Sequence, residues 1–254
     1  MDTGTAVGTA DWTMRTGGRL EAAQRRRMIA DLARVQVGNA VGRLSVLAHL
    51  NQGRNAYVPP ARLLPPDSPL TRAARDVATR TLPTTLLNHS YRAWRFGRAI
   101  GELEQVDVDA ELLFAAAMLH DTGLVLADGL DDFTLTSARV ASDVAEQVAL
   151  STAATQTLQT AITMHHSPRV SRSAGPVAYL LSAGAGVDVV GLRSWDLPRA
   201  TLAAAVRDHP RDGFKKYFAE AWADESARVP HGRARLLRRY GAFTTAIRLA
   251  PFDE

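Results

Sequence analysis

The sequence predicts an all-α protein, a single helical bundle with an N-terminal arm. Apolar residues recur at spacings of three and four along most of the 254-residue chain, which is the period of a helix with one buried face. No segment alternates apolar and polar residues between turn signals, as a half-buried strand would. With 46% hydrophobic residues, the chain has enough apolar surface to bury a sizeable core.

We divide the chain at its proline-rich stretch into an N-terminal arm of residues 1–66, with helices that pack on the bundle, and the helical bundle itself, residues 67–254. Residues 1–18 are small, polar and rich in Gly and Thr, so we expect a loose tail or an extended arm over the surface. A helix is predicted over about 20–50. Its apolar stripe includes Leu32, Val37, Val41, Leu44 and Leu47.

The bundle begins after a connector that holds five prolines. Asp67-Ser68-Pro69 is suited to start a helix, because Asp or Ser caps a helix and Pro fits its first turn. Short breakers then separate further helices of ten to twenty residues. We expect helices over residues 70–81, 85–105, 109–121, 136–149, 151–166, 175–188, 198–208, 212–227 and 232–247.

The chain contains no cysteine. Disulfides, a thiol nucleophile, cysteine zinc fingers and cysteine-ligated iron–sulfur clusters are therefore excluded, and a metal would have to be held by His and carboxylate. No stretch reaches the roughly 18 apolar residues of a membrane span, and the N-terminus lacks the pattern of a secretory signal. We expect a cytoplasmic protein without a membrane partner.

The basic charge is no argument for a nucleic-acid partner. The chain has 30 Lys and Arg against 26 Asp and Glu, and 28 of the 30 are Arg, a usage typical of GC-rich genomes. A nucleic-acid surface would gather its cations on one face. The clusters at residues 25–27 and at Arg233, Arg235, Arg238 and Arg239 lie in segments that we interpret as solvated faces of surface helices.

Four polar residues fall on the apolar stripes of four predicted helices: His89, His120, His165 and Asp188. A single such His is often a core residue bound to a carbonyl, but a buried carboxylate must pair with a cation or a metal. Asp121 joins the set, because Thr122-Gly123 ends the turn after His120. These imidazoles and carboxylates suit zinc, iron or manganese, and we take one divalent ion, zinc first, as the expected cofactor.

The segments around these residues resemble a known family. LLNHSYRAWRFGRAI, LLFAAAMLHDTG, AITMHHSP and GAGVDVVG, in that order, are similar to the HD-domain superfamily of metal-dependent hydrolases. The fuller pattern of TLPTTLLNHSYR, HDTG and AITMHHSP resembles its cyanamide-hydratase-like branch. The resemblance covers about residues 67–193. It implies an HD-domain bundle in which His89, His120, Asp121 and Asp188 ligate the metal.

The resemblance also implies roles beside the metal. His165 matches a histidine that orients substrate or moves a proton, and we assign catalysis to His165 and Asp121. His166 departs from the branch, which has a small polar residue there, and we group it with Asn88 and Arg92 as substrate-binding. For Arg92 we keep an equal alternative to substrate binding, in which its side chain lies on the solvated edge of its helix.

A bound ion lowers the pKa of water towards neutrality, and the resulting hydroxide is the nucleophile in each of two candidate reactions. In the first, it hydrates a small nitrile-like molecule and His165 donates a proton. In the second, it hydrolyses a nucleotide or another phosphate ester, which needs cations for the phosphate. The four windows around the site hold three Arg and no Lys, where the chain average predicts about five, so the hydratase is the first choice.

Two further alternatives are weaker. A di-iron oxygenase would need well-separated extra histidines, but only the adjacent His165 and His166 stand between the His-Asp pair and Asp188. A metal-free structural protein would not need the complete ligand set. The expected partner is a small-molecule substrate, and the N-terminal arm is a candidate for contacts between subunits of a homo-oligomer.

Overall fold

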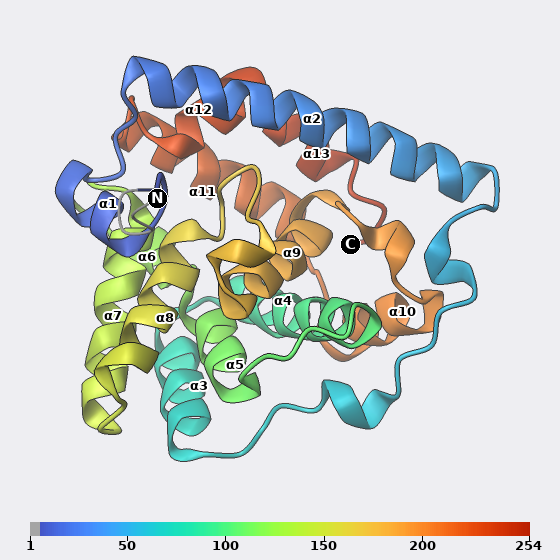
Figure 1. Cartoon of the computed structure of the whole chain (residues 1–254), viewed down its shortest axis with the longest axis horizontal. Helices are drawn as coiled ribbons and strands as arrows, with labels where there is room; N and C mark the ends of the chain where they lie inside the picture. Colours follow the sequence, from blue (N-terminus) through green and yellow to red (C-terminus); the bar gives the residue numbers. More distant parts are fainter. Residues whose placement is uncertain (1–5) are drawn as a thin grey trace.

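The structure, a computed structural model, describes residues 6–254 and contains helices only. Thirteen α-helices and no β-strand occur in this range (Figure 1), which confirms the all-α prediction. None of these helices has the length and apolar character to span a membrane. The helices are α1 (Ala10–Thr16), α2 (Ala22–Leu47), α3 (Pro69–Thr81), α4 (Thr84–Leu103), α5 (Ala110–Leu119), α6 (Thr122–Leu126), α7 (Phe133–Gln147), α8 (Thr152–Met164), α9 (Pro176–Val190), α10 (Arg199–Asp208), α11 (Phe214–Arg228), α12 (Arg233–Tyr240) and α13 (Phe243–Arg248).

Helix α5 lies at the centre of the bundle. Every residue from Leu112 to Leu119 is buried, as expected for a helix that is apolar on all sides. Asp109 caps it, since its carboxylate accepts hydrogen bonds from the backbone N–H groups of Glu111 and Leu112 at 2.9 and 3.0 Å. Helices α3, α4, α7, α8 and α9 surround α5, so its C-terminal end is held deep in the protein.

Helices α4 and α9 run along each other in close contact. Glycines allow this approach. A Cβ atom added to Gly184 would lie 2.1 Å from the backbone oxygen of Ala93, and one added to Gly97 would lie 2.5 Å from that of Leu180. The two helices that carry His89 and Asp188 are therefore in backbone contact.

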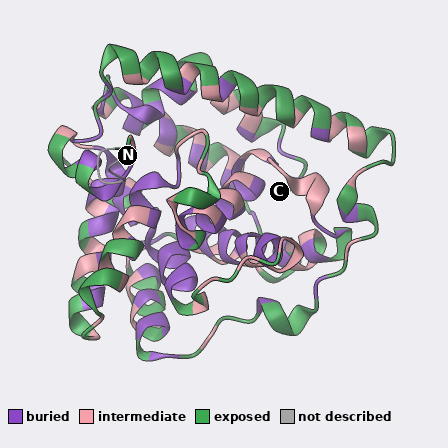
Figure 2. Ribbon diagram, viewed as in Figure 1, coloured by how far each residue is buried: buried purple, intermediate pink, exposed green. Residues whose placement is uncertain are grey.

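The N-terminal arm joins the same core as the bundle. Trp12, Leu20 and Leu32 are buried in one continuous apolar cluster with residues of the bundle helices. Helix α2 crosses one face of the molecule beside α12 and α13 (Figure 1). Its outer surface is exposed (Figure 2). That surface includes most of the predicted stripe: Val37, Val41, Leu44 and Leu47 are 62–77% exposed.

The N-terminus is more ordered than the sequence predicts. Residues 1–5 of the expected tail lie outside the described residues, but residues 10–16 form α1. Thr9 begins it by accepting a hydrogen bond from the backbone N–H of Trp12, and Gly17 ends it with a φ of 60°. The indole of Trp12 is 2% exposed. Packing of this one large side chain against the bundle orders a segment whose composition is typical of a tail.

The prediction of one continuous helix over 232–247 is wrong in the middle of this range. The helix breaks between α12 and α13, where Ala242 has a φ of 47° and Gly241 packs against Leu32 of α2. A Cβ atom at Gly241 would approach the side chain of Leu32 within 3.0 Å. The extra short helix α6 after the His-Asp pair was also not predicted, because five residues show no period.

The other predicted helices are present, with ends shifted by up to three residues. The start at residues 67–69 is confirmed. Ser68 is the cap and Pro69 the first residue of α3, with Ser68 Oγ accepting from the N–H of Thr71 at 3.3 Å.

The α4–α9 contact predicts opposite effects for two glycines on one helix. Gly184→Ala should lower the free energy of unfolding by about 1–3 kcal/mol, because the new methyl group would collide with the backbone of α4. Gly186→Ala meets only the flexible side chain of Leu192 at 3.6 Å and should raise stability by up to about 1 kcal/mol through helix propensity. Denaturant unfolding measures both. Equal effects of the two substitutions would contradict this packing.

Candidate metal centre

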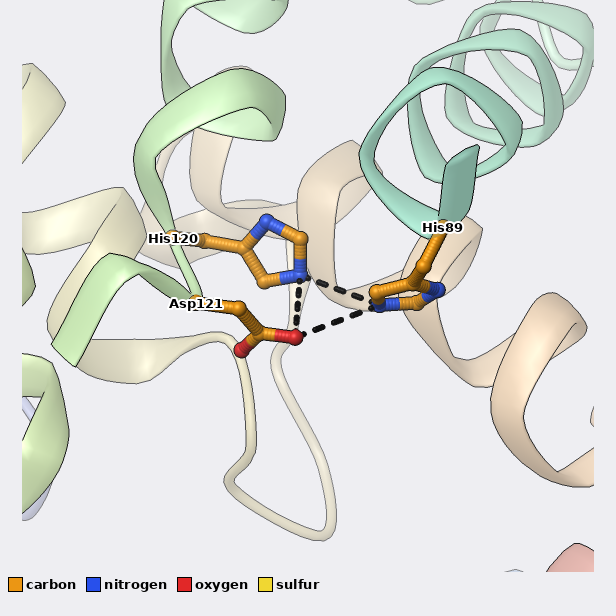
Figure 3. Close-up of side chains that lie close together, drawn as sticks. All are labelled: His89, His120 and Asp121. Atoms are coloured by element: carbon orange, nitrogen blue, oxygen red, sulfur yellow. Dashed lines mark hydrogen bonds and ion pairs between the residues drawn. The ribbon is translucent and has the colours of Figure 1, made fainter. Parts of the chain in front are cut away.

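Three of the predicted ligands lie together in the core: His89, His120 and Asp121 (Figure 3). The Nε2 atoms of the two histidines are 3.2 Å apart. Asp121 Oδ2 lies 3.5 Å from His89 Nε2 and 3.3 Å from His120 Nε2. None of the three side chains is more than 1% exposed. We call these residues the His-His-Asp cluster.

The local backbone turns Asp121 inward. Helix α5 ends at Leu119, whose carbonyl accepts a hydrogen bond from the Thr122 hydroxyl at 2.8 Å. Asp121, with φ −106° and ψ 7°, begins α6. Gly123 lets α6 approach α7, since a Cβ there would lie 1.9 Å from the Phe133 oxygen. The sequence HDTG thus places two adjacent side chains on the same side of a turn.

Hydrogen bonds define which ring nitrogens carry protons. His120 Nδ1 lies 2.8 Å from the Ala117 carbonyl, and His89 Nδ1 lies 2.7 Å from Asp188 Oδ2. Carbonyl and carboxylate oxygens only accept, so each Nδ1 donates and each neutral ring has its lone pair on Nε2. The two lone pairs face each other across 3.2 Å and cannot form a hydrogen bond with one another.

Asp121 completes this arrangement of acceptors. Both of its oxygens are buried, and neither has a hydrogen-bond partner among the described residues. Burial lowers the pKa of His120 to about 3, so the ring is neutral at pH 7. Burial acts to raise the pKa of Asp121, but the adjacent His120 holds it below its ordinary value. Neutral imidazoles and carboxylates are the forms in which these side chains bind a divalent ion, and the donor set of the cluster fits one.

Asp188 lies behind His89 rather than beside it in the cluster. Arg92 donates to both of its oxygens, at 2.7 and 2.9 Å, and Arg211 donates to Oδ1 at 2.6 Å. The side chains of Asp188, Arg92 and Arg211 are all fully buried. Burial alone would raise the pKa of Asp188, but Arg92, His89 and Arg211 together lower it. A carboxylate on Nδ1 fixes the tautomer and orientation of a metal-binding histidine, which differs from the direct ligation implied by the resemblance.

Arg92 and Asn88 both donate to backbone carbonyls at the end of α10 and just after it. Arg92 also donates to the backbone oxygens of His209 and Pro210 at 2.8 and 2.9 Å, and Asn88 donates to that of Pro210 at 3.0 Å. Arg92 is fully buried, so the solvated-edge alternative is wrong, whereas a role of Arg92 and Asn88 in substrate binding stays a prediction. Arg211 was missed, because it stands in a loop where no periodicity marks a buried residue.

His165 and His166 both reach the site from the end of α8. His165 Nδ1 lies 2.7 Å from the Ile162 carbonyl, so its Nε2 is free of a proton when the ring is neutral and lies 3.5 Å from Asp121 Oδ1. The His166 ring packs against Phe133 and Trp222. Burial and Arg233 lower the pKa of His166 to about 4. Neither of its ring nitrogens has a hydrogen-bond partner among the described residues.

Arg233 is a second case in which the sequence-based interpretation is wrong. The residue is fully buried and donates to Asp132 Oδ2 at 3.0 Å and to the Thr163 carbonyl at 2.6 Å. Its place in an Arg-rich helix suggested a solvated face. Only the tertiary contacts of its side chain with the start of α7 and the end of α8 place it inside.

A pocket opens onto the His-His-Asp cluster. Its cavity measures about 120 Å³, and His165 and His166 form part of its wall. The rest of the wall is mainly apolar and includes Val189, Phe218 and Trp222. No Lys or Arg is among the described residues that line it.

Comparison with known proteins agrees with this geometry. The profile of the HD domain family matches residues 86–208, the segment that contains the cluster, both following histidines and Asp188. The chain carries an HD domain. HD domains belong to a superfamily of metal-dependent hydrolases, as the resemblance implied.

Two relatives share a shorter segment with this chain. They are the cyanamide hydratases DDI2 and DDI3 of Saccharomyces cerevisiae, each 36% identical over 69 residues. The match covers 26% of this chain and 31% of each hydratase, so the chain spans about a third of the length of these relatives. The HD domain itself supplies the cluster, whereas Arg211 and part of the pocket wall come from outside residues 86–208.

The cluster predicts a stoichiometric metal ion that depends on Asp121. Asp121→Asn should weaken binding of the ion at least about a hundredfold, because substitutions of residues that only support a ligand already cost ten- to a hundredfold. Metal analysis and competition with a chelator measure this. Asp128→Asn removes an exposed carboxylate two residues beyond α6 and should leave the ion bound. Full metal content in the Asp121 variant would contradict the assignment.

Asp188 should also be essential for stability without any metal. Asp188→Asn would leave two buried guanidinium groups without their carboxylate and should lower the free energy of unfolding of the metal-free protein by about 3–5 kcal/mol. Asp208→Asn is the control, since it breaks a partly exposed ion pair with Arg95 and should cost about 1 kcal/mol or less. Similar losses in the two variants would show that the buried arginines do not depend on Asp188.

Proposed function

We propose that this protein is a metal-dependent hydratase that adds water to a small nitrile-like molecule. The observation that carries the proposal is the pocket over the His-His-Asp cluster, whose described lining contains no Lys or Arg. A neutral substrate needs no cation there. The partial similarity to proteins named cyanamide hydratase supports the same reaction.

The ion would be held by His89, His120 and Asp121, with Asp188 supporting His89 through its Nδ1. Their nitrogen and oxygen donors suit zinc, iron or manganese, and zinc is our proposed ion. A divalent ion in such a site lowers the pKa of water and polarises the substrate. In the net reaction one water adds across the C≡N bond: its oxygen bonds to carbon, nitrogen gains two hydrogens, and an amide results.

His165 is the proposed proton carrier of the reaction. Its Nδ1 is fixed on the Ile162 carbonyl, so Nε2 is the atom that takes up and releases a proton. That atom lies 3.5 Å from Asp121 Oδ1, where the carboxylate stabilises the protonated ring. His165 also lines the pocket, so it can deliver the proton to the substrate nitrogen.

The phosphohydrolase alternative lacks the cations that it needs. A phosphate group in a buried site is held by Arg or Lys. Arg92 and Arg211 are bound to Asp188, which contacts His89, and Arg233 is bound to Asp132. The geometry therefore favours a neutral substrate over a nucleotide or another phosphate ester.

Activity measurements with the metal-loaded protein test the proposal. We expect cyanamide and small nitriles to be hydrated, and nucleoside monophosphates and phosphodiesters to be left intact. His165→Asn should lower kcat about 10²- to 10⁴-fold while the metal content stays unchanged. His49→Asn alters an exposed histidine with a left-handed φ of 58° that Asn tolerates, and it should retain full activity. Turnover of phosphate esters alone would overturn the proposal.

A further inference from the structure

The pocket extends well beyond the cluster into a wall that the HD domain does not supply. Leu32 and Val35 come from α2, Leu237 from α12, and Phe243 and Ala246 from α13. These helices lie outside residues 86–208. They come from opposite ends of the chain and lie beside one another (Figure 1), and each contributes to the lining of the pocket. All five side chains are apolar.

Hydrogen bonds hold this wall in place. Gln36 of α2 donates from Nε2 to the Gly241 carbonyl between α12 and α13 at 2.8 Å. Arg43 of α2 donates to the carbonyl of Val190, at the end of α9, at 3.1 Å. The apolar wall is thus tied both to the C-terminal helices and to the helix that carries Asp188.

The size of the cavity exceeds what cyanamide requires. An apolar cavity of about 150 Å³ admits benzene, so one of about 120 Å³ accepts a molecule only slightly smaller. Cyanamide would fill the part next to the cluster and leave the apolar wall without a partner. An alkyl group attached to the reacting carbon would cover that wall and leave the polar end at His165.

We propose that the molecule which occupies this site is a nitrile bearing a short alkyl group of about three carbons, seated against Val35, Leu237 and Ala246. The nitrile group is inferred from the proposed hydratase function, whereas the alkyl group is inferred from the apolar wall alone. Each added methylene should increase affinity about fourfold, the value expected for transfer of a buried methylene from water. The gain stops when the cavity is full.

Binding and turnover are measured separately across one series: acetonitrile, propionitrile, butyronitrile and valeronitrile, with cyanamide for comparison. Binding to the full-length chain, both metal-loaded and metal-stripped, is followed by ¹⁹F NMR displacement of 4,4,4-trifluorobutyronitrile. Turnover of the metal-loaded protein is followed by amide formation. We expect affinity and kcat/KM to rise about fourfold per methylene up to butyronitrile.

Three variants test the wall. Ala246→Phe fills the cavity and should lower the butyronitrile-to-acetonitrile ratio of kcat/KM at least tenfold. Val35→Ala enlarges the cavity and should lengthen the alkyl group of the best substrate by one carbon. This second variant tests the wall even if Ala246→Phe does not fold. Ala30→Phe adds the same ring to the exposed side of α2 and should leave the ratio unchanged.

The outcomes separate this inference from the proposed function. Hydration of cyanamide without any gain in binding or turnover from the alkyl groups would overturn the inference and leave the hydratase standing. Chain-length-dependent binding that Ala246→Phe abolishes, without amide formation, would uphold the inference and contradict the hydratase.

Discussion

The buried carboxylate of Asp188 is the interaction on which the site depends. It is shared by His89, Arg92 and Arg211, which come from α4 and from the loop after α10. A buried charge is tolerated only when it is paired and fully hydrogen-bonded, so these donors must be held close together. The glycine contact between α4 and α9 brings Asp188 within reach. Packing of two helices thereby decides the orientation of the His89 ring.

That pairing has consequences for the pocket. Arg92 and Arg211 donate to Asp188 and to backbone carbonyls, and Arg233 is bound to Asp132. None of these guanidinium groups lines the cavity over the cluster. The protein therefore has many arginines, yet Asp121 and the histidines are the only titratable residues in the described wall of its pocket. A basic composition and a neutral binding site are compatible because the nearby cations are already paired inside the core.

Much of the helical content could be predicted from local patterns. Periodic apolar residues and the caps at Ser68 and Asp109 act within a few residues of the chain, so their effect is visible in the sequence. The order of α1 depends on Trp12 packing into the bundle, and the break before α13 depends on Gly241 packing against α2. The exposed part of the α2 stripe shows the converse, since periodicity indicates an amphipathic face but not what covers it.

The sequence by itself determined the helical class and the residues of the His-His-Asp cluster, because buried polar residues in an apolar period must satisfy one another. It also placed His165 and His166 beside them. Only the tertiary structure decided that Asp188 lies behind His89, that Arg92 and Arg233 are interior, and that α2 and α13 close the pocket. Those relations join residues up to about 200 positions apart, such as Gln36 and Gly241. Side chains so distant meet only through packing, which no local period encodes.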